Sequence, residues 1–92
     1  MRVAAKFDPK KYVINQRKHG VPLSEGDGVL SDPLAVTIED TSVEGEFRFI
    51  AVGRNIFGAV MVVVWTDRGD DIRVMSVRRA EPKERRSYEK GV

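Results

Sequence analysis

The second half of the chain alternates apolar and polar side chains with a period of two, the pattern of half-buried β-strands. Four such segments follow one another, over residues 34–40, 46–54, 59–66 and 72–79. The connections between them are short and are either polar or contain glycine, as in β-hairpins. The third segment is apolar at nearly every position, so we expect it in the centre of the sheet. The pattern predicts an antiparallel four-stranded meander.

The first third of the chain instead carries helix signals. Asp8 fits the N-cap of a helix with Pro9 at its first position, and Gly20 fits its C-terminal stop. Ser24 and Asp27 match the two ends of a capping box. This match predicts a second, short helix, although the segment contains two glycines that weaken a helix.

The two chain ends complete the predicted fold. Residues 2–7 fit a short additional strand, and Pro82 opens a last helix that Gly91 ends. Ninety-two residues suffice for one domain. We therefore predict an α+β fold in a single domain over residues 1–92, with helices covering one face of the sheet.

Side-chain parity within the strands predicts which residues face away from the helices. In the last strand, Met75 and Val77 share one face, and the residues next to them share the other. The polar residues expected on the open face are Glu46, Arg48, Arg54, Ser76 and Arg78. They would surround an apolar middle and form a shallow polar cleft.

Charge is unevenly distributed along the chain, although the net charge is only +2. Residues 1–20 carry six basic side chains and one acidic side chain. Residues 21–71 carry three basic and ten acidic side chains, and residues 72–92 carry seven basic and three acidic ones. If the fold brings the two basic ends together, the resulting surface attracts phosphate. Alternatively, the three blocks neutralise one another, and the counts alone leave both outcomes open.

Composition excludes several classes of protein and site. The chain has no cysteine and one histidine, so disulfides, thiolate metal sites and a transition-metal cluster are excluded. Its longest apolar run is far shorter than the about 20 residues that cross a bilayer. No phosphate-binding glycine loop and no nucleophile elbow occurs. We therefore expect a cytoplasmic protein with no metal, no cofactor and no membrane contact.

The arginines suit one reaction that needs no metal ion. When the 2′-hydroxyl of RNA attacks the neighbouring phosphate, negative charge builds up on the phosphoryl oxygens, and guanidinium groups stabilise it. The reaction also needs a base and an acid. The side chains that can serve are Lys18, His19, Glu46 and Tyr88. Three of these side chains also have a structural interpretation. Glu46 fits an exposed ion pair with Arg48, His19 fits the C-terminal cap of a helix, and Tyr88 fits a core position.

Motifs along nearly the whole chain resemble those of the BrnT family, the ribonuclease toxins of type II toxin–antitoxin systems. They are FD at residues 7–8, Lys11 and Asn15 leading to KHGV at 18–21, DPL at 32–34, GEFRF at 45–49, VGR at 52–54, VVVWTDRG at 62–69 and IRVMSVRRAEPKERRSYE at 72–89. The resemblance implies a compact RelE-like α/β fold and ribonuclease activity that halts translation. It also implies a BrnA-like antitoxin, a ribbon-helix-helix protein that binds operator DNA and neutralises the toxin by direct contact.

The resemblance also implies roles for particular residues. Arg78 is the first choice for stabilising the transition state, Arg48 is the second expected catalytic arginine, and either Glu46 or His19 is the base or acid. The other expected phosphate contacts are Lys18, Arg54, Arg73 and Arg79. Arg73 has the opposite parity to Arg78, so a bulge is needed to bring both to one face.

The last helix departs from the family pattern at its first turn. Such helices often begin with a Ser or Thr cap, whereas Glu81 stands here before Pro82, so we expect a less stable helix start. We assign Glu84 a structural role, pairing either with Arg85 or Arg86 or with the helix N-terminus.

Three functional hypotheses follow. The first is a metal-independent endoribonuclease toxin that acts on RNA and contacts operator DNA only through its antitoxin. The second is a non-catalytic module whose cationic face binds nucleic acid or a protein. The third is a complex subunit whose open face is covered by a partner segment that folds on binding. The third is compatible with the first, since covering the cleft would inhibit cleavage.

Overall fold

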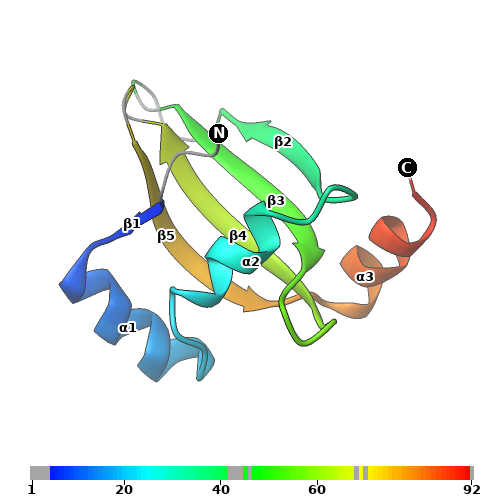
Figure 1. Cartoon of the computed structure of the whole chain (residues 1–92), viewed down its shortest axis with the longest axis horizontal. Coiled ribbons are helices and arrows are strands. Elements are labelled where there is room, and N and C mark those ends of the chain that lie inside the picture. Colours follow the sequence, from blue (N-terminus) through cyan, green and yellow to red (C-terminus); the bar gives the residue numbers. More distant parts are fainter. Residues whose placement is uncertain (1–4, 42–44, 46, 68, 70, 92) are drawn as a thin grey trace.

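The computed structural model describes residues 5–41, 45, 47–67, 69 and 71–91. Its strands are β1 (Ala5–Phe7), β2 (Val36–Asp40), β3 (Arg48–Arg54), β4 (Val60–Asp67) and β5 (Ile72–Arg79). They form one sheet in the order β1-β5-β4-β3-β2, as Figure 1 shows. The predicted meander from β2 to β5 is confirmed, and β4 is central as expected. The additional strand β1 pairs in parallel with β5, which makes the sheet mixed.

The first helix, α1 (Pro9–His19), begins and ends where the sequence predicts. The Asp8 carboxylate accepts a hydrogen bond of 2.8 Å from the Lys10 backbone N–H, which satisfies one of the free donors of the first turn. Gly20 ends the helix in the left-handed conformation at φ 68°, where a Cβ atom would be unfavourable. With both ends fixed, α1 lies along β5.

The second helix, α2 (Glu25–Leu30), packs closely on one face of the sheet because of a glycine. Gly26 is buried, and a Cβ atom there would lie 3.1 Å from methyl groups of both Val74 and Val77. A larger residue would push the helix away from the sheet. The predicted capping box is wrong, since the Ser24 side chain makes no cap hydrogen bond.

The hydrophobic core lies between α2 and the sheet. Its buried members are Val21, Leu23, Val29, Met61, Val63, Val74 and Val77. Phe49 and Trp65 stack beside it with 4.4 Å between ring centroids, and Trp65 packs against it. Each fully buried aliphatic side chain contributes about 1.5–3 kcal/mol, so this cluster is the main source of hydrophobic stabilisation on that face.

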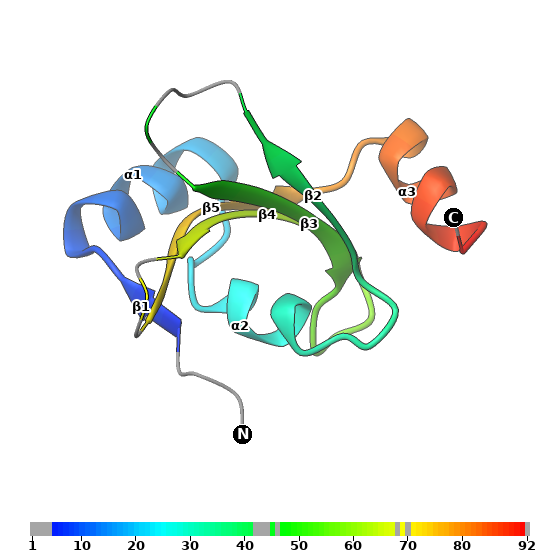
Figure 2. The ribbon, with the colours of Figure 1, turned by 90° about the horizontal axis from the view of Figure 1, so that it is seen from above.

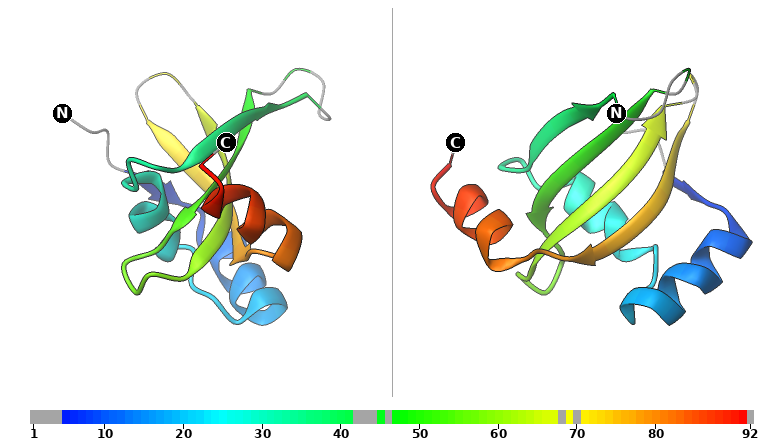
Figure 3. Two further views of the ribbon diagram at one scale, coloured as in Figure 1. Left: turned by 90° about the vertical axis from the view of Figure 1, so that its right-hand side faces the viewer. Right: turned by 180° about the vertical axis from the view of Figure 1, so that it is seen from behind.

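The opposite face of the sheet is only partly covered. The third helix, α3 (Pro82–Glu89), lies against one end of it, where Tyr88 is buried and lines a groove with Val52. Figure 2 shows α2 and α3 on different sides of the sheet. The prediction that the helices cover a single face is therefore wrong. Figure 3 (right) shows the remainder of this open face, with α2 behind the sheet.

A carboxylate holds the start of α3. Pro82 begins the helix and Gly91, at φ 71°, follows its end, as predicted. Glu84 accepts a hydrogen bond of 2.8 Å from the backbone N–H of Glu81, one half of a capping box. This bond compensates for the missing hydroxyl cap. In the described part of the chain, no helix has the length and apolar composition that a membrane span requires.

A bulge in β5 changes which side chains share a face. The register with β4 shifts by one residue at Met75. Arg73 therefore lies on the same face as Ser76 and Arg78, despite its opposite parity in the sequence. The expectation that Met75 shares a face with Val77 is wrong: Val77 is buried in the core, whereas Met75 lines a pocket with Ser76.

Candidate active site

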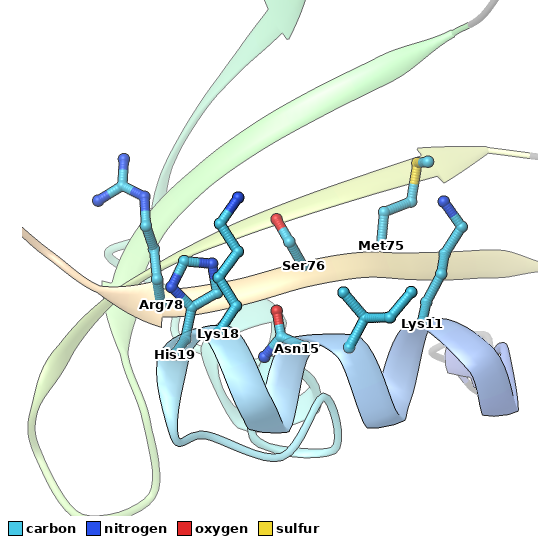
Figure 4. Close-up of a pocket in the computed structure, with 8 residues that line it drawn as sticks. Lys11, Asn15, Lys18, His19, Met75, Ser76 and Arg78 are labelled. Carbon is cyan, nitrogen blue, oxygen red and sulfur yellow. The ribbon is translucent and has the colours of Figure 1, made fainter.

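A pocket of about 390 Å³ lies between α1 and β5, beside the open face of the sheet. Its described lining comes from these two elements: Lys11, Ile14, Asn15, Lys18 and His19 of α1, and Met75, Ser76 and Arg78 of β5 (Figure 4). The structure thus brings together three of the predicted site residues, Lys18, His19 and Arg78. They come from segments about 60 residues apart in the sequence.

Asn15 attaches α1 to β5. Its side chain is buried and exchanges two hydrogen bonds with the backbone of Val77: Nδ2 donates to the carbonyl at 2.9 Å, and Oδ1 accepts from the N–H at 3.0 Å. Nδ2 also donates to the carbonyl of Val21 at 2.7 Å. The strand β1 pairs with β5 only as far as Val74. Beyond Val74, the side-chain amide of Asn15 satisfies the backbone of β5 as a neighbouring strand would. This contact fixes the orientation of α1.

The same face of α1 carries the cations of the pocket. Lys18 and His19 follow Asn15 by three and four residues, and Lys11 precedes it by four, so the helix directs all of them to the pocket side. No carboxylate is among the described residues that line the pocket. Within the described part of the chain, the side chains of Lys11, Lys18 and His19 form no ion pair or hydrogen bond. The positive charge of the two lysines therefore remains available to an anion.

Arg78 lines the same pocket, but a carboxylate holds it. Its Nη1 and Nη2 atoms each donate a 2.8 Å hydrogen bond to one oxygen of Glu84, forming a bidentate pair. This hydrogen bonding raises the pKa of Arg78 and lowers the pKa of Glu84, and the Glu81 N–H contributes to the second effect. Nε of Arg78 makes none of the hydrogen bonds found among the described residues. That edge of the guanidinium can still bind an anion.

Glu84 therefore has a different arginine partner from the one expected. It contacts the N-terminus of α3 as predicted, but it pairs with Arg78 on β5 instead of Arg85 or Arg86 on its own helix. The consequence for the site is that the strand and the start of α3 are joined at Arg78.

Arg48 and Arg73 lie at the other end of the open face. Both pair across the sheet with Thr66 of β4, whereas Arg78 pairs with Val62. These two rows are four residue steps apart along β4, which corresponds to roughly 13 Å. The structure therefore does not bring Arg48 and Arg73 into the pocket of Arg78, although all three share one face.

Each of these two arginines has an acidic neighbour. Nε of Arg48 lies 4.0 Å from a carboxylate oxygen of Asp40, and Nε of Arg73 lies 4.0 Å from one of Asp71. Part of their charge is therefore balanced locally. Glu46, the predicted alternative base next to this group, falls outside the described residues.

Arg54 and Arg79 line a different pocket, of about 290 Å³, near α3. Arg54 supports the fold there, since its Nη1 donates to the Gly58 carbonyl at 3.0 Å and its guanidinium lies 5.6 Å from the centre of the Tyr88 ring. The hydroxyl of buried Tyr88 donates a 2.5 Å hydrogen bond to Asp32, which raises the pKa of Tyr88. Tyr88 thus anchors α3, in agreement with its structural interpretation.

Residues 7–84 match a family model described as the ribonuclease toxin BrnT of type II toxin–antitoxin systems. The chain belongs to the BrnT ribonuclease toxin family. Membership places it among enzymes that hydrolyse RNA and implies a cognate antitoxin as its partner. The matched stretch contains every described residue of the α1–β5 pocket, and also Glu84.

A solved BrnT structure has the same fold. The 1.1 Å crystal structure of the Brucella abortus ribonuclease toxin BrnT matches with a TM-score of 0.64 and 23% sequence identity, covering 82% of this chain and 92% of that one. At this level of identity, the likeness concerns the fold alone. No curated protein sequence matches the chain.

Sequence reasoning did not identify how the BrnT-family site is assembled. Asn15 is a motif residue of the resemblance, but its role as the link to β5 was not recognised. The available signal was its spacing: it lies four residues after Lys11 and three before Lys18, so it shares their helix face. A polar side chain at that position in a short helix needs a partner, and the strand supplies it.

Proposed function

We propose that this BrnT-family chain is an endoribonuclease whose reaction requires no metal ion, with the α1–β5 pocket as its active site. The observation that supports the proposal most strongly is the meeting of His19, Lys18 and Arg78 in one pocket. An imidazole exchanges a proton near neutral pH, and the two cations stabilise a phosphoryl group that gains negative charge. Together they match what cleavage at an RNA phosphate demands.

In the proposed step, the 2′-oxygen of one nucleotide forms a bond to the adjacent phosphorus. The bond between that phosphorus and the 5′-oxygen of the next nucleotide breaks. A base removes the proton of the 2′-hydroxyl, and an acid protonates the departing 5′-oxygen. The products are a 2′,3′-cyclic phosphate and a 5′-hydroxyl. Because the RNA supplies its own nucleophile, the step needs no metal-bound water.

We assign His19 to proton transfer, and Lys18 and Arg78 to the charge on the phosphoryl oxygens. Glu46 remains the alternative base that the family resemblance implies. The distance of Arg48 from the pocket argues for RNA binding in place of the catalytic role first expected for it. The same role, contact with phosphates away from the cleaved bond, is proposed for Arg54, Arg73 and Arg79.

The proposed cellular effect is inhibition of translation through RNA cleavage. The antitoxin that we propose is a BrnA-like ribbon-helix-helix protein that neutralises the toxin by direct contact. In this scheme the antitoxin binds operator DNA, and the toxin reaches DNA only through it.

The test is cleavage of RNA by the purified protein in excess chelator. We expect fragments that end in a 2′,3′-cyclic phosphate. His19→Ala should lower kcat/KM by about 10²–10⁴-fold, the usual contribution of a positioned acid or base. Arg17→Ala is the matched control, because Arg17 is an exposed neighbour that does not line the pocket, and it should change kcat/KM by less than about twofold.

Two outcomes would count against the proposal. Cleavage that the chelator abolishes would contradict the metal-independent step. RNA binding without any cleavage would favour the non-catalytic binding module instead, and its salt dependence would then report the number of phosphate contacts.

A further inference from the structure

A groove of about 320 Å³ lies on the open face of the sheet, next to α3. Its floor is aliphatic and consists of Val36 and Ile38 of β2 and Ile50 and Val52 of β3. Ile38 is 58% exposed although it is a large apolar residue. A concave apolar surface of this kind is typical of a site that binds another apolar surface.

The shape of the groove suits a segment of polypeptide. Val36 pairs with Val52 and Ile38 with Ile50, so the floor consists of two adjacent cross-strand pairs on one face. The helix α3 supplies part of the groove lining, and β2, which supplies another part, is the outer strand of the sheet (Figure 3). An elongated chain can therefore lie over the floor and also reach the free edge of β2.

Arg78 lines both this groove and the α1–β5 pocket. Its bidentate partner Glu84 lines the groove as well, which demonstrates that a carboxylate fits against this guanidinium. A bound segment with an acidic side chain near Arg78 would gain a charge-assisted hydrogen bond from the Nε edge. The same segment would cover Arg78 from the side of the groove.

RNA is the poorer occupant of the groove. Its phosphates gain nothing from four aliphatic side chains, and the described lining offers them a single cation, Arg78, next to a carboxylate, Glu84. The α1–β5 pocket, in contrast, offers Lys11 and Lys18 without a carboxylate in its described lining. The two cavities therefore favour different classes of ligand, yet they share Arg78.

We infer that the groove is the docking site for a segment of the cognate antitoxin that membership of the family implies. The segment places aliphatic side chains on Ile38 and Ile50 and an acidic side chain against Arg78. RNA cleavage as proposed above uses Arg78 too, so bound antitoxin and bound RNA exclude each other. That exclusion rests on the proposed function, whereas the docking site does not.

The test compares Ile38→Asp with Phe57→Asp. Phe57 is the matched control, because it is also a large, exposed apolar residue but lies in the β3–β4 hairpin outside the groove. The probe is the antitoxin encoded beside the toxin, titrated into full-length toxin by calorimetry. Ile38→Asp should weaken binding roughly 30-fold or more, the loss typical of a central interface residue, and leave RNA cleavage unchanged. Phe57→Asp should change neither.

Two further variants separate the docking site from the proposed catalytic role. Lys18→Ala should weaken RNA binding and leave antitoxin binding intact, whereas Arg78→Ala should weaken both. If these two variants cleave RNA normally while Ile38→Asp releases the antitoxin, the proposed function fails and the docking site stands.

Three results would overturn the docking site. The first is antitoxin binding that Ile38→Asp does not weaken, in a variant whose melting temperature shows that it is folded. The second is an Ile38→Asp variant that loses RNA binding but keeps antitoxin binding, which would make the groove an RNA site. The third is toxin self-association that Ile38→Asp abolishes, since the occupant would then be a second copy of the chain.

Discussion

Two groups of cations differ in their neighbours more than in their own chemistry: one lines the α1–β5 pocket beside the open sheet face, and the other lies on the strands of that face. Lys11 and Lys18, in the α1–β5 pocket, have no carboxylate in the described lining around them. Arg48 and Arg73, in the second group, each lie 4.0 Å from an acidic side chain. The comparison teaches that the availability of a cation depends on what packs beside it, and that shared strand parity does not make a site.

Arg78 is intermediate between the two groups. It belongs to the pocket with the unpaired lysines, but Glu84 binds both of its terminal nitrogens. Such a pair attracts an incoming phosphate less strongly than a free cation does, but its geometry is fixed in advance. We therefore expect Lys18 to contribute attraction and Arg78 to contribute an oriented donor.

The largest effect is expected from Arg78→Ala compared with Arg48→Ala. Loss of one oriented donor to a developing oxyanion lowers kcat by about 10²–10³-fold, which is the expectation for Arg78. Arg48→Ala should lower it by less than about tenfold, because its charge is far from the pocket and partly balanced. Single-turnover cleavage measures both, and equal losses would mean that the two cation groups act on the same phosphate.

The attachment of α1 can be broken with Asn15→Leu. The variant leaves the N–H and carbonyl of Val77 without their partner, at about 1–3 kcal/mol for each buried group, so the free energy of unfolding should fall by about 2–6 kcal/mol. Gln16→Leu, at the exposed neighbouring position, should change it by less than about 0.5 kcal/mol. Urea denaturation measures both changes. If Asn15→Leu is as stable as the parent, the amide is not what holds the pocket together.

A smaller effect is expected in acid. The pKa of Glu84 in the folded protein lies below its ordinary value of 4.5, chiefly because Arg78 donates to the carboxylate. Such a group stabilises the fold fully above the unfolded pKa, and this contribution is lost as the pH falls through the folded pKa. Glu84→Gln should therefore reduce the loss of stability below about pH 4.5, by less than about 1 kcal/mol because the pair is partly exposed. Identical acid-unfolding curves for variant and parent would show that the pair contributes nothing to stability.

The smallest effect is expected from Asp40→Asn, which makes the Arg48 end more similar to the pocket. Removing one negative charge should raise RNA affinity at low salt by less than about threefold, without a change in kcat. Filter binding at two salt concentrations measures the change in affinity. A large gain in kcat would contradict the division of roles, because it would reveal a second catalytic site suppressed by its carboxylate.

Much of the fold could be predicted because its signals are local. Asp8 and Pro9 mark the start of α1, Gly20 marks its end, and the period of two marks the meander, each through residues a few positions apart. The bulge at Met75 has no comparable signal, since one extra residue only reverses the parity that follows it. Without the bulge, Arg73 could not be placed on the correct face.

The candidate site was predictable by residue type but not by partner. Lys18, His19 and Arg78 suit phosphate chemistry and match family motifs, so they could be named in advance. Their meeting depends on the hydrogen bonds between Asn15 and Val77, which are 62 residues apart. Periodicity reports the spacing of residues within one element, and it carries no information about which side chain closes a contact between two.

The most direct test of the central claim is to map where an uncleavable RNA binds. A short RNA with 2′-methoxy groups in place of its 2′-hydroxyls lacks the nucleophile, so it can be titrated into ¹⁵N-labelled toxin while amide chemical shifts are followed by NMR. We predict the largest shift changes at Lys18, His19 and Ser76, with the amides of Arg48 and Arg73 nearly unchanged. Largest changes at Arg48 and Arg73, with an unperturbed α1–β5 pocket, would contradict the assignment of the active site.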